Sequence, residues 1–223
     1  MPLTIDRERN PARSRAAILD AAEKLFAEKG YDATSLSEVG AAAGVSRGTP
    51  GYFFGSKQEL YDAVLERCFE EVRQAVRAGR ARAMASQQPP EAILAGAVSD
   101  YFDFLAARPN FIRLIERRAL REGGTSPVGE QLSAGQEALA AISAELGLDD
   151  APSGDAAQLL LSIIALCWFH LIHAQTVAPA VGVSLEEPAD LERRKRHVVG
   201  LVLYGLRGLE RPAATLTTAP AHD

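Results

Sequence analysis

A short stretch of the chain brings together a guanidinium, a hydroxyl, a phenol and an ammonium group in Arg47, Thr49, Tyr52 and Lys57. The guanidinium of Arg47 matches the two acceptors that guanine presents in the major groove, so Arg47 is the candidate for reading a base directly. Thr49 offers a hydroxyl to a base or a methyl group to thymine, and Gly48 permits close approach of the backbone. Tyr52 and Lys57 suit phosphate contacts, and Lys57 would lie at a helix N-terminus, which attracts anions.

A segment without charged residues contains a second group of side chains that could bind a ligand or a metal. From Ala156 to Leu185 the chain contains no Asp, Glu, Lys or Arg. Trp168, His170 and His173 lie in its middle, and the two histidines would share one face of a helix. No carboxylate or cysteine with ligand spacing accompanies them, so we expect no metal site and no cofactor, but histidines of the core or of an interface.

Two short helices with a tight turn between them are expected to carry the first group. Ser35 and Glu38 form a capping box, in which the hydroxyl accepts a first-turn N–H and the carboxylate reaches back to the cap. The apolar face of this helix is formed at helical spacing by Leu36, Val39 and Ala43. Gly44 ends the helix because glycine adopts positive φ without a Cβ clash, and Ser46 is expected to cap a second helix. This arrangement is a helix-turn-helix, whose second helix enters the major groove.

Pro50 and Gly51 are unfavourable residues for that second helix. With Ser46 as the cap, Pro50 lies at the edge of the first turn, where its missing N–H costs least. The alternative is a plain turn. We favour the helix because Tyr52 and Phe53 need an element that places them.

A helix from Pro11 to Lys29, stopped by Gly30, is expected before the helix-turn-helix. The segment from Thr34 to Lys57 and residues 15–30 together resemble the DNA-binding domain of the tetracycline-repressor (TetR) family. The matching residues cover the first quarter of the chain: Ile18, Leu19, Ala21, Ala22, Leu25, Phe26, Gly30, Thr34, Ser35, Ala43, Gly44, Val45, Ser46, Gly48, Thr49, Phe54, Ser56 and Lys57. The resemblance implies an all-α fold, in which an N-terminal three-helix head with a helix-turn-helix is joined by a long helix to a larger ligand-binding and dimerisation body.

The resemblance also implies which residues contact DNA. It supports phosphate contacts by Thr34, Tyr52 and Lys57. The family often has a phosphate-contacting tyrosine where this chain has Gly51, so that contact is open and Tyr52 is the candidate to replace it. The complete set expected at the DNA is Thr34, Ser35, Ser46, Arg47, Gly48, Thr49, Tyr52, Phe53 and Lys57.

The net charge of −5 argues at first sight against a nucleic-acid partner. Basic and acidic residues are equal in number among residues 1–60, however, so the deficit lies beyond them. A neutral domain can bind DNA if its cations converge on one face. Arg7, Arg9, Arg13 and Arg15 form either a solvated arm or contacts to phosphates and the minor groove, and both interpretations stay open.

Cys68 and Cys167 are far apart in the chain, so buried thiols are expected rather than a disulfide framework or a zinc site. The first residues lack the apolar segment of a signal peptide. We therefore expect a cytoplasmic, nucleoid-associated protein.

The expected domains are a disordered arm over residues 1–10, the helix-turn-helix domain over 11–56, the ligand-binding and dimerisation domain over 57–211, and a disordered tail over 212–223. Ser56 and Glu59 form a second capping box, which opens a long helix. Later helices are expected to begin or end at Pro90, Pro109, Gly123, Ser126 and Gly147. Val128 and Leu132 are expected to face inward.

The charge-free segment is long enough to span a membrane, but its polar residues and Pro179 argue against one. A helix that is apolar on all sides is otherwise buried on both, here against its own subunit and against a second. With the helix expected from Pro188 it resembles the family's four-helix dimer interface. We expect a homodimer through residues 154–178 and 188–209 and no membrane contact, with the basic run of residues 193–196 solvated.

Aromatic side chains of the body are most often core residues. In the resembled family, however, the body encloses a largely apolar pocket with a few polar anchors. The residues expected to line it are Tyr101, Phe102, Phe104, Phe111, Trp168, His170 and His173.

The sequence thus predicts a homodimeric, ligand-responsive transcriptional regulator whose partners are a double-stranded DNA operator and a small-molecule effector. The simplest form is a repressor released from a near-palindromic operator by a small, largely apolar effector. The alternative is an all-helical enzyme or carrier that uses the body pocket, with His170 and His173 as metal ligands or acid–base groups. No nucleophile–base pair, metal quartet or phosphate loop supports an enzyme. A helical scaffold that only dimerises is the third possibility.

Overall fold

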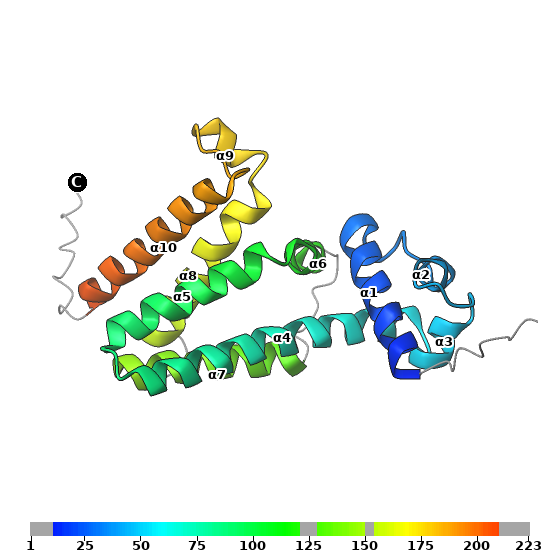
Figure 1. Ribbon diagram of the computed structural model, residues 1–223, viewed down its shortest axis with the longest axis horizontal. Coiled ribbons are helices and arrows are strands. Elements are labelled where there is room, and N and C mark those ends of the chain that lie inside the picture. The colour runs from blue at the N-terminus through cyan, green and yellow to red at the C-terminus, as the bar shows by residue number, and fades with distance from the viewer. Residues whose placement is uncertain (1–10, 121–128, 150–153, 210–223) are drawn as a thin grey trace, which may run out of the picture. The chain divides into compact units, whose positions relative to one another are not determined.

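The computed structural model describes residues 11–120, 129–149 and 154–209, and its regular structure there is entirely helical (Figure 1). The helices are α1 (Pro11–Lys29), α2 (Leu36–Ala42), α3 (Thr49–Phe54), α4 (Lys57–Ser86), α5 (Pro90–Ala106), α6 (Pro109–Ala119), α7 (Gly129–Leu146), α8 (Asp155–Ile172), α9 (Val177–Ala180) and α10 (Pro188–Leu209). The all-α class predicted from the sequence is confirmed.

These helices form two compact units. The first comprises the described residues up to Gln74 and those from Leu105 to Gly135, and the second comprises those from Ala75 to Phe104 and from Gln136 onwards. The division falls inside α4, whereas the predicted domain boundary, which stays a prediction, was placed at residue 57. The predicted arm and tail, and the helix limits at Gly123 and Ser126 with Val128, lie outside the described residues.

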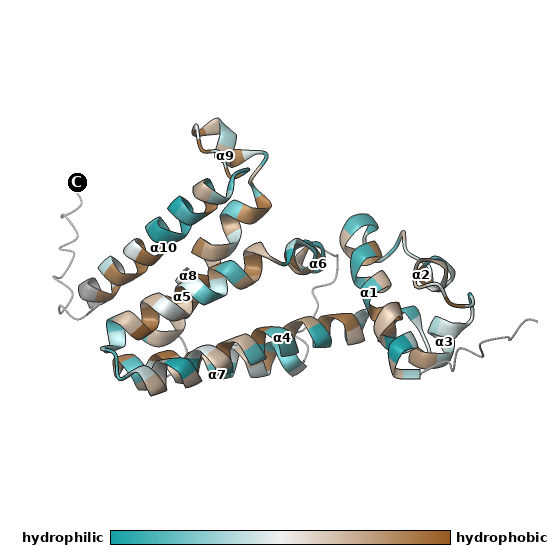
Figure 2. Cartoon of the chain, viewed as in Figure 1, coloured by the Kyte–Doolittle hydropathy of each residue, from teal (hydrophilic) through white to brown (hydrophobic). Residues whose placement is uncertain are grey.

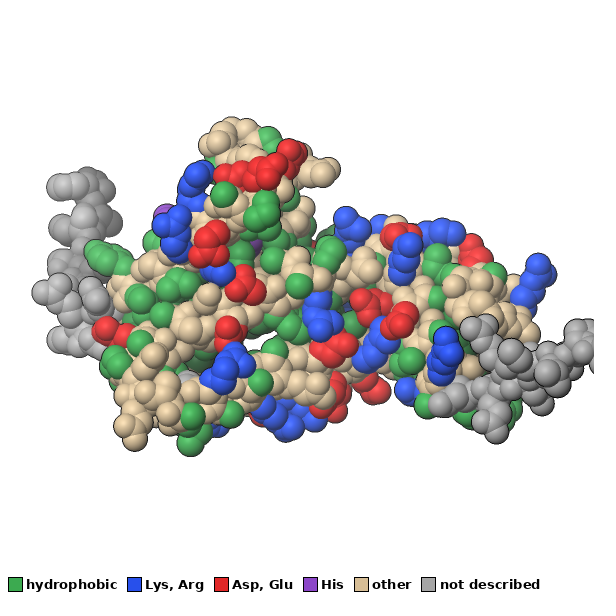
Figure 3. Space-filling model, viewed as in Figure 1, with side chains coloured by type: hydrophobic (Ala, Val, Ile, Leu, Met, Phe, Trp, Pro, Cys, Tyr) green, Lys and Arg blue, Asp and Glu red, His purple; other side chains and the backbone are tan. Residues whose placement is uncertain are grey.

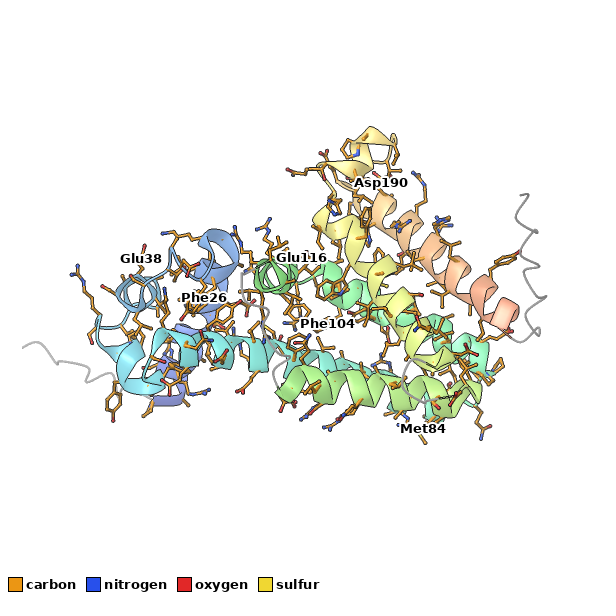
Figure 4. All side chains as sticks on the ribbon, turned by 180° about the vertical axis from the view of Figure 1, so that it is seen from behind. Phe26, Glu38, Met84, Phe104, Glu116 and Asp190 are labelled. Carbon is orange, nitrogen blue, oxygen red and sulfur yellow. The ribbon has the colours of Figure 1, made fainter. Side chains whose placement is uncertain are left out.

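In the first unit, α1, α2 and α3 pack around a small apolar core. α1 begins at Pro11 and ends at Lys29, where Gly30 adopts a φ of 86°, both as predicted. The buried core residues include Ile18, Ala22, Phe26, Val39 and Leu60. Phe26 points into the centre of these helices in Figure 4, and the ring of Tyr61 on α4 meets it edge-on at 5.1 Å. Aromatic packing of this kind fixes α1 against the start of α4.

α4 begins at the capping box that the sequence predicted. The N–H of Ser56 donates to Glu59 Oε2 at 2.7 Å, and the N–H of Glu59 donates to Ser56 Oγ at 3.1 Å. Farther along, Phe69 meets the ring of Phe111 on α6 edge-on at 5.4 Å, and α6 packs against α1. α1, α4 and α6 therefore pack together, and α2 and α3 pack against α1.

The second unit contains α5, α8 and α10 with parts of α4 and α7. Its buried side chains follow helical spacing and include Leu94, Val98 and Phe102 on α5, Ile163 and Cys167 on α8, and Val198, Val202 and Leu206 on α10. Ion pairs join the helices at the surface, from Arg77 to Glu137 at 2.6 Å and from Lys195 to Asp103 at 3.0 Å.

α7 agrees with the sequence at its end but not at its start. Gly147 follows the helix with a φ of 62°, as predicted. Leu132 was expected to face inward, and it is 52% exposed. That prediction is wrong, because the small Ala134 is the residue that α7 buries at this point.

Candidate nucleic-acid interface

α2 begins with both halves of the predicted capping box. The N–H of Glu38 donates to Ser35 Oγ at 3.2 Å, and the N–H of Ser35 donates to Glu38 Oε2 at 2.9 Å. The ammonium of Lys29, 3.1 Å from Glu38 Oε1, and these bonds from Ser35 lower the pKa of the Glu38 carboxyl. The box satisfies first-turn donors that would otherwise need water, and it fixes where α2 starts.

The turn between α2 and α3 is tight, and α3 begins later than predicted. A Cβ at Gly40 would lie 2.9 Å from the carbonyl oxygen of Ser46, so a glycine lets the turn approach α2 this closely. Gly44 ends α2 with a φ of 68°, as predicted. Ser46 is not the cap, because α3 starts at Thr49 and the two hydroxyl oxygens of Ser46 and Thr49 lie 2.6 Å apart. Pro50 occupies the first turn of α3, where no N–H is required.

Arg47 and Tyr52 are exposed on either side of this helix start. Arg47 and Gly48 lie in the turn before α3, and a Cβ built at Gly48 would meet nothing within 4 Å. Tyr52 is 86% exposed. Phe54, two residues on, is buried beneath the guanidinium of Arg15, which lies 4.9 Å from the ring centre. α3 is thus anchored from below by one aromatic ring and presents another to the outside.

Thr34 and Lys57 serve contacts within the chain. Thr34 is 2% exposed, and its hydroxyl donates to the carbonyl oxygen of Gly30 at 2.8 Å. The Lys57 ammonium donates to the carbonyl oxygens of Tyr31 at 3.0 Å and Asp32 at 3.4 Å, and it lies 4.4 Å from the centre of the Tyr31 ring. An ammonium has three N–H donors, so half-buried Lys57 keeps capacity for a phosphate. The Thr34 side chain fixes the loop before α2, and its predicted phosphate contact gains no support from this burial.

Charges of both signs lie side by side over the first unit in the view of Figure 3. Arg67 is neutralised by Asp20 at 2.6 Å and Glu23 at 2.7 Å. Arg13 and Arg15 on α1 are exposed. Because acidic side chains pair with Arg67 and not with every cation, a head with no net charge still exposes cations such as Arg13 and Arg15.

In the second unit, four of the residues predicted to line a pocket form two pairs between α5 and α8. The indole Nε1 of Trp168 donates to the hydroxyl oxygen of Tyr101 at 2.8 Å. The imidazole of His170 stacks on Phe102, with 4.7 Å between ring centres and 10° between the ring planes. Both pairs combine an apolar ring with a polar group, and both join α5 to α8.

His170 and His173 do not form one site, although they are three residues apart. His170 is 5% exposed, and its burial, followed by the positive charge of Arg194, lowers its pKa to about 4. His173 follows the last turn of α8 and lies against Phe169, with 4.5 Å between ring centres. Within the described ranges no group of three or more His, Cys, Asp or Glu side chains could hold a metal ion.

Phe104 and Phe111 differ in their burial. Phe111 is 2% exposed and belongs to the first unit, where it packs against Phe69. Phe104 is half-buried towards the end of α5 (Figure 4). Phe111 is therefore placed as a core residue, which is the usual position of an aromatic side chain.

The basic run of residues 193–196 is not uniformly solvated, so that prediction is wrong. The Lys195 side chain is 16% exposed, and its ammonium lies 2.7 Å from Glu192 and 3.0 Å from Asp103, which raises its pKa. Arg194 is half-buried, and its Nε is buried without a hydrogen-bond partner among the described residues. The cause is that α10 turns one side of this run towards the rest of its unit.

Arg117 on α6 is another residue that the sequence did not single out. Its Nε donates to the carbonyl oxygen of Ala27 at 3.0 Å, and one terminal nitrogen donates to that of Glu28 at 3.0 Å. Carbonyls in the last turn of a helix lack partners within it, so Arg117 caps α1 from a distant part of the chain.

α8 and α10 pack against each other and leave an apolar surface uncovered, the α8–α10 face. Its residues are Leu161 and Phe169 on α8 and Leu201 and Tyr204 on α10, each at least 43% exposed. Figure 2 shows that α10 is hydrophilic in its first half and more hydrophobic in its second, where Leu201 and Tyr204 lie. By length and composition α8 could also cross a membrane, a test that the core helix of a soluble protein passes as well.

Two family models match the chain. The model described as "Bacterial regulatory proteins, tetR family" matches residues 18–64, which run from α1 into α4. The model described as "Tetracyclin repressor-like, C-terminal domain" matches residues 90–202, about half of the chain.

Individual proteins agree with these models. The HTH-type transcriptional repressor NicS of Pseudomonas putida is 26% identical over 216 residues, which are 92% of this chain and 96% of that protein. The HTH-type transcriptional activator FasR of Mycolicibacterium smegmatis is 35% identical over 101 residues, 45% of this chain and 44% of that protein. The solved structure of the fatty acid degradation regulator FadR from Bacillus halodurans shares the fold, with a TM-score of 0.62 at 20% identity over 85% of this chain and 98% of that one. The chain belongs to the tetR family of bacterial regulatory proteins, and it is a ligand-responsive, DNA-binding transcriptional regulator rather than an enzyme.

Proposed function

We propose that the protein is a homodimeric repressor that binds a near-palindromic operator and leaves it when a small, largely apolar effector binds. The observation that carries this proposal is the exposure of Arg47 and Tyr52 on a head whose own core is closed by Phe54. Repression is favoured because NicS, which is similar over nearly its whole length, is named a repressor. FasR, named an activator, is similar over less than half of its length. As a cytoplasmic DNA-binding protein it would be associated with the nucleoid.

The DNA contacts follow from what each exposed group can donate. Arg47 reads a guanine through its guanidinium, and open Gly48 lets the backbone approach the duplex. Thr49 contacts a base, while Tyr52 and the remaining donor of Lys57 bind phosphates and fix the register. The exposed hydroxyls of Ser35 and Ser46 and the half-exposed ring of Phe53 complete the proposed set.

The α8–α10 face is the proposed contact between subunits. Four large apolar side chains at least 43% exposed are unusual for a lone subunit, and a second copy would cover them. A two-fold dimer presents the same surface on both subunits and places two heads in a two-fold arrangement. A near-palindromic operator follows, because each head reads one half-site.

The effector would bind where α5 meets α8, at the Tyr101–Trp168 and Phe102–His170 pairs. It weakens DNA binding only to the extent that it prefers an arrangement of the dimer that does not fit the operator. Effector and operator must then weaken each other's binding by the same factor.

Selection from random duplexes with the full-length protein tests the proposal. We expect enrichment of a sequence with approximate two-fold symmetry, and the affinity for it should fall steeply with added salt. A reporter gene placed behind that sequence should be expressed less when the protein is present. No enrichment at low salt would overturn DNA binding, and increased expression of the reporter would overturn repression.

A further inference from the structure

We infer that the body binds an organic acid, whose carboxylate is held by Arg194 and His170 while its apolar part lies against the aromatic residues of α5 and α8. This inference names the chemical class of the effector and therefore rests on the proposed function. Its site can nevertheless be tested without DNA, so the two can fail separately.

The first observation is that Arg194 lacks, among the described residues, the ion pairs that its neighbours form. Its neighbours on α10 are paired, Arg193 with Asp190 at 3.2 Å (Asp190 is labelled in Figure 4) and Lys195 with Asp103 at 3.0 Å. Half-buried Arg194 has no ion pair among the described residues, and its Nε is buried without a hydrogen-bond partner. A buried guanidinium N–H needs an acceptor, and the described part of this subunit supplies none to the Nε of Arg194.

The second observation concerns His170, which lies on α8, the helix that packs against the α10 helix carrying Arg194. It is 5% exposed, and neither ring nitrogen has a hydrogen-bond partner of acceptable geometry, although the Leu166 carbonyl one turn earlier is near. Buried polar groups in native proteins are nearly always bonded. A buried imidazole without a well-formed hydrogen bond, on a helix that packs against the helix of Arg194, therefore marks a place for a polar group from outside the chain.

The charges select the class of that group. The pKa of His170 is lowered to about 4, so the imidazole is neutral at pH 7 and can present an N–H from either nitrogen. Burial raises the pKa of the Cys167 thiol to about 12, and burial likewise raises the pKa of Tyr101, so neither supplies an anion. The positive charge of Arg194 and an N–H of the imidazole favour a carboxylate, which forms short charge-assisted bonds, whereas an amine would meet the charge of Arg194.

Trp168 makes the test direct, because it is the single tryptophan of the chain. Its fluorescence is followed while the full-length protein is titrated with octanoate or benzoate, one flexible and one flat. Each acid is compared with its uncharged amide and with octylamine or benzylamine. We expect saturable binding of at least one acid, its amide to bind ~10-fold more weakly or worse, and no binding of the amines.

Three variants test whether Arg194 and His170 bind the carboxylate. Arg194→Gln should weaken binding of the acid ~10-fold or more and leave binding of the amide within about 2-fold. His170→Phe, which keeps a flat ring against Phe102, should also weaken the acid more than the amide. Arg193→Gln is the matched control, since its guanidinium is 75% exposed and paired with Asp190, and it should bind the acid as the wild type does.

The outcomes separate the two claims. Three outcomes would each overturn the inference. Neither acid binds, or acid and amide bind equally well, or the Arg194→Gln variant dissociates into monomers but binds the acid normally. If operator binding is intact in those cases, the regulator stands without an acid site. Saturable, Arg194-dependent acid binding that does not release the operator supports the site and overturns its role as the effector site.

Discussion

Trp168 donates a hydrogen bond of 2.8 Å from its indole Nε1 to the hydroxyl oxygen of Tyr101, and this bond links α8 to α5. The Tyr101→Phe substitution removes this acceptor and should lower the free energy of unfolding by about 1 kcal/mol. Urea unfolding followed through Trp168 fluorescence measures the loss. Tyr52→Phe, at a tyrosine that is 86% exposed, is the control and should stay within about 0.5 kcal/mol of wild type. Equal stability of both variants would contradict a structural role for this bond.

Tyr52→Phe should nevertheless weaken operator binding. The change removes only a hydroxyl from an exposed ring, so we expect about a 5- to 10-fold loss of affinity from one phosphate contact and no loss of fold. Fluorescence anisotropy with the selected operator measures the affinity, and the affinity for unrelated duplexes should fall by a similar factor. Unchanged affinity for both kinds of duplex would exclude Tyr52 from the interface.

Ser35→Ala should destabilise the protein by about 1 kcal/mol, because it breaks the hydroxyl half of the capping box at the start of α2. Ser37→Ala, at an exposed serine that forms no capping bond in the first turn of the same helix, is the matched control. It should be neutral or slightly stabilising, since alanine is the better helix former. Thermal unfolding of both variants distinguishes the cap from a general effect of losing a serine.

Leu201→Glu should convert the proposed dimer to a monomer, because it places a charge in the α8–α10 face. Light scattering after size-exclusion chromatography gives the mass, and the variant should lose operator affinity because its two heads no longer bind together. Met84→Glu changes a side chain that is 67% exposed on α4 and should remain dimeric. A dimeric Leu201→Glu variant would move the interface elsewhere.

The stability should depend on pH through His170. Its pKa is about 4 in the folded protein and about 6.5 in an unfolded chain, so between these values the unfolded chain binds more protons. The contribution of the neutral imidazole is fully present above pH 6.5 and is lost as the pH falls towards 4, by on the order of 2 kcal/mol. The free energy of unfolding of wild type and His170→Gln is measured from pH 7 to 4, and it should fall less steeply with falling pH in the variant. His173→Gln should show the pH dependence of the wild type.

Local signals in the sequence predicted much of the head. A capping box needs only residues three apart, so Ser35 and Glu38 located the start of α2, and Gly44 located its end. The start of α3 was missed by two residues, because Ser46 and Gly48 can both precede a helix and only the packing of the turn against Gly40 decides between them.

Features that depend on distant packing could not be read from the sequence. The run of residues 193–196 looks solvated, and only the orientation of α10 shows that Arg194 is half-buried and that Lys195 reaches Asp103. In the same way, Arg117 finds its carbonyl partners on α1 through a contact between parts of the chain about ninety residues apart. Phe111 and Phe102 look alike in the sequence, but they pack in different units.

The central claim is that Arg47 reads a base, and competition binding tests it most directly. The selected operator and versions of it with each G·C pair replaced are titrated against wild type, Arg47→Ala and the exposed control Arg80→Ala. We predict that Arg47→Ala loses about 1–3 kcal/mol of discrimination at one base pair per half-site, while Arg80→Ala discriminates as wild type does. Full wild-type discrimination by Arg47→Ala at every position would contradict the account.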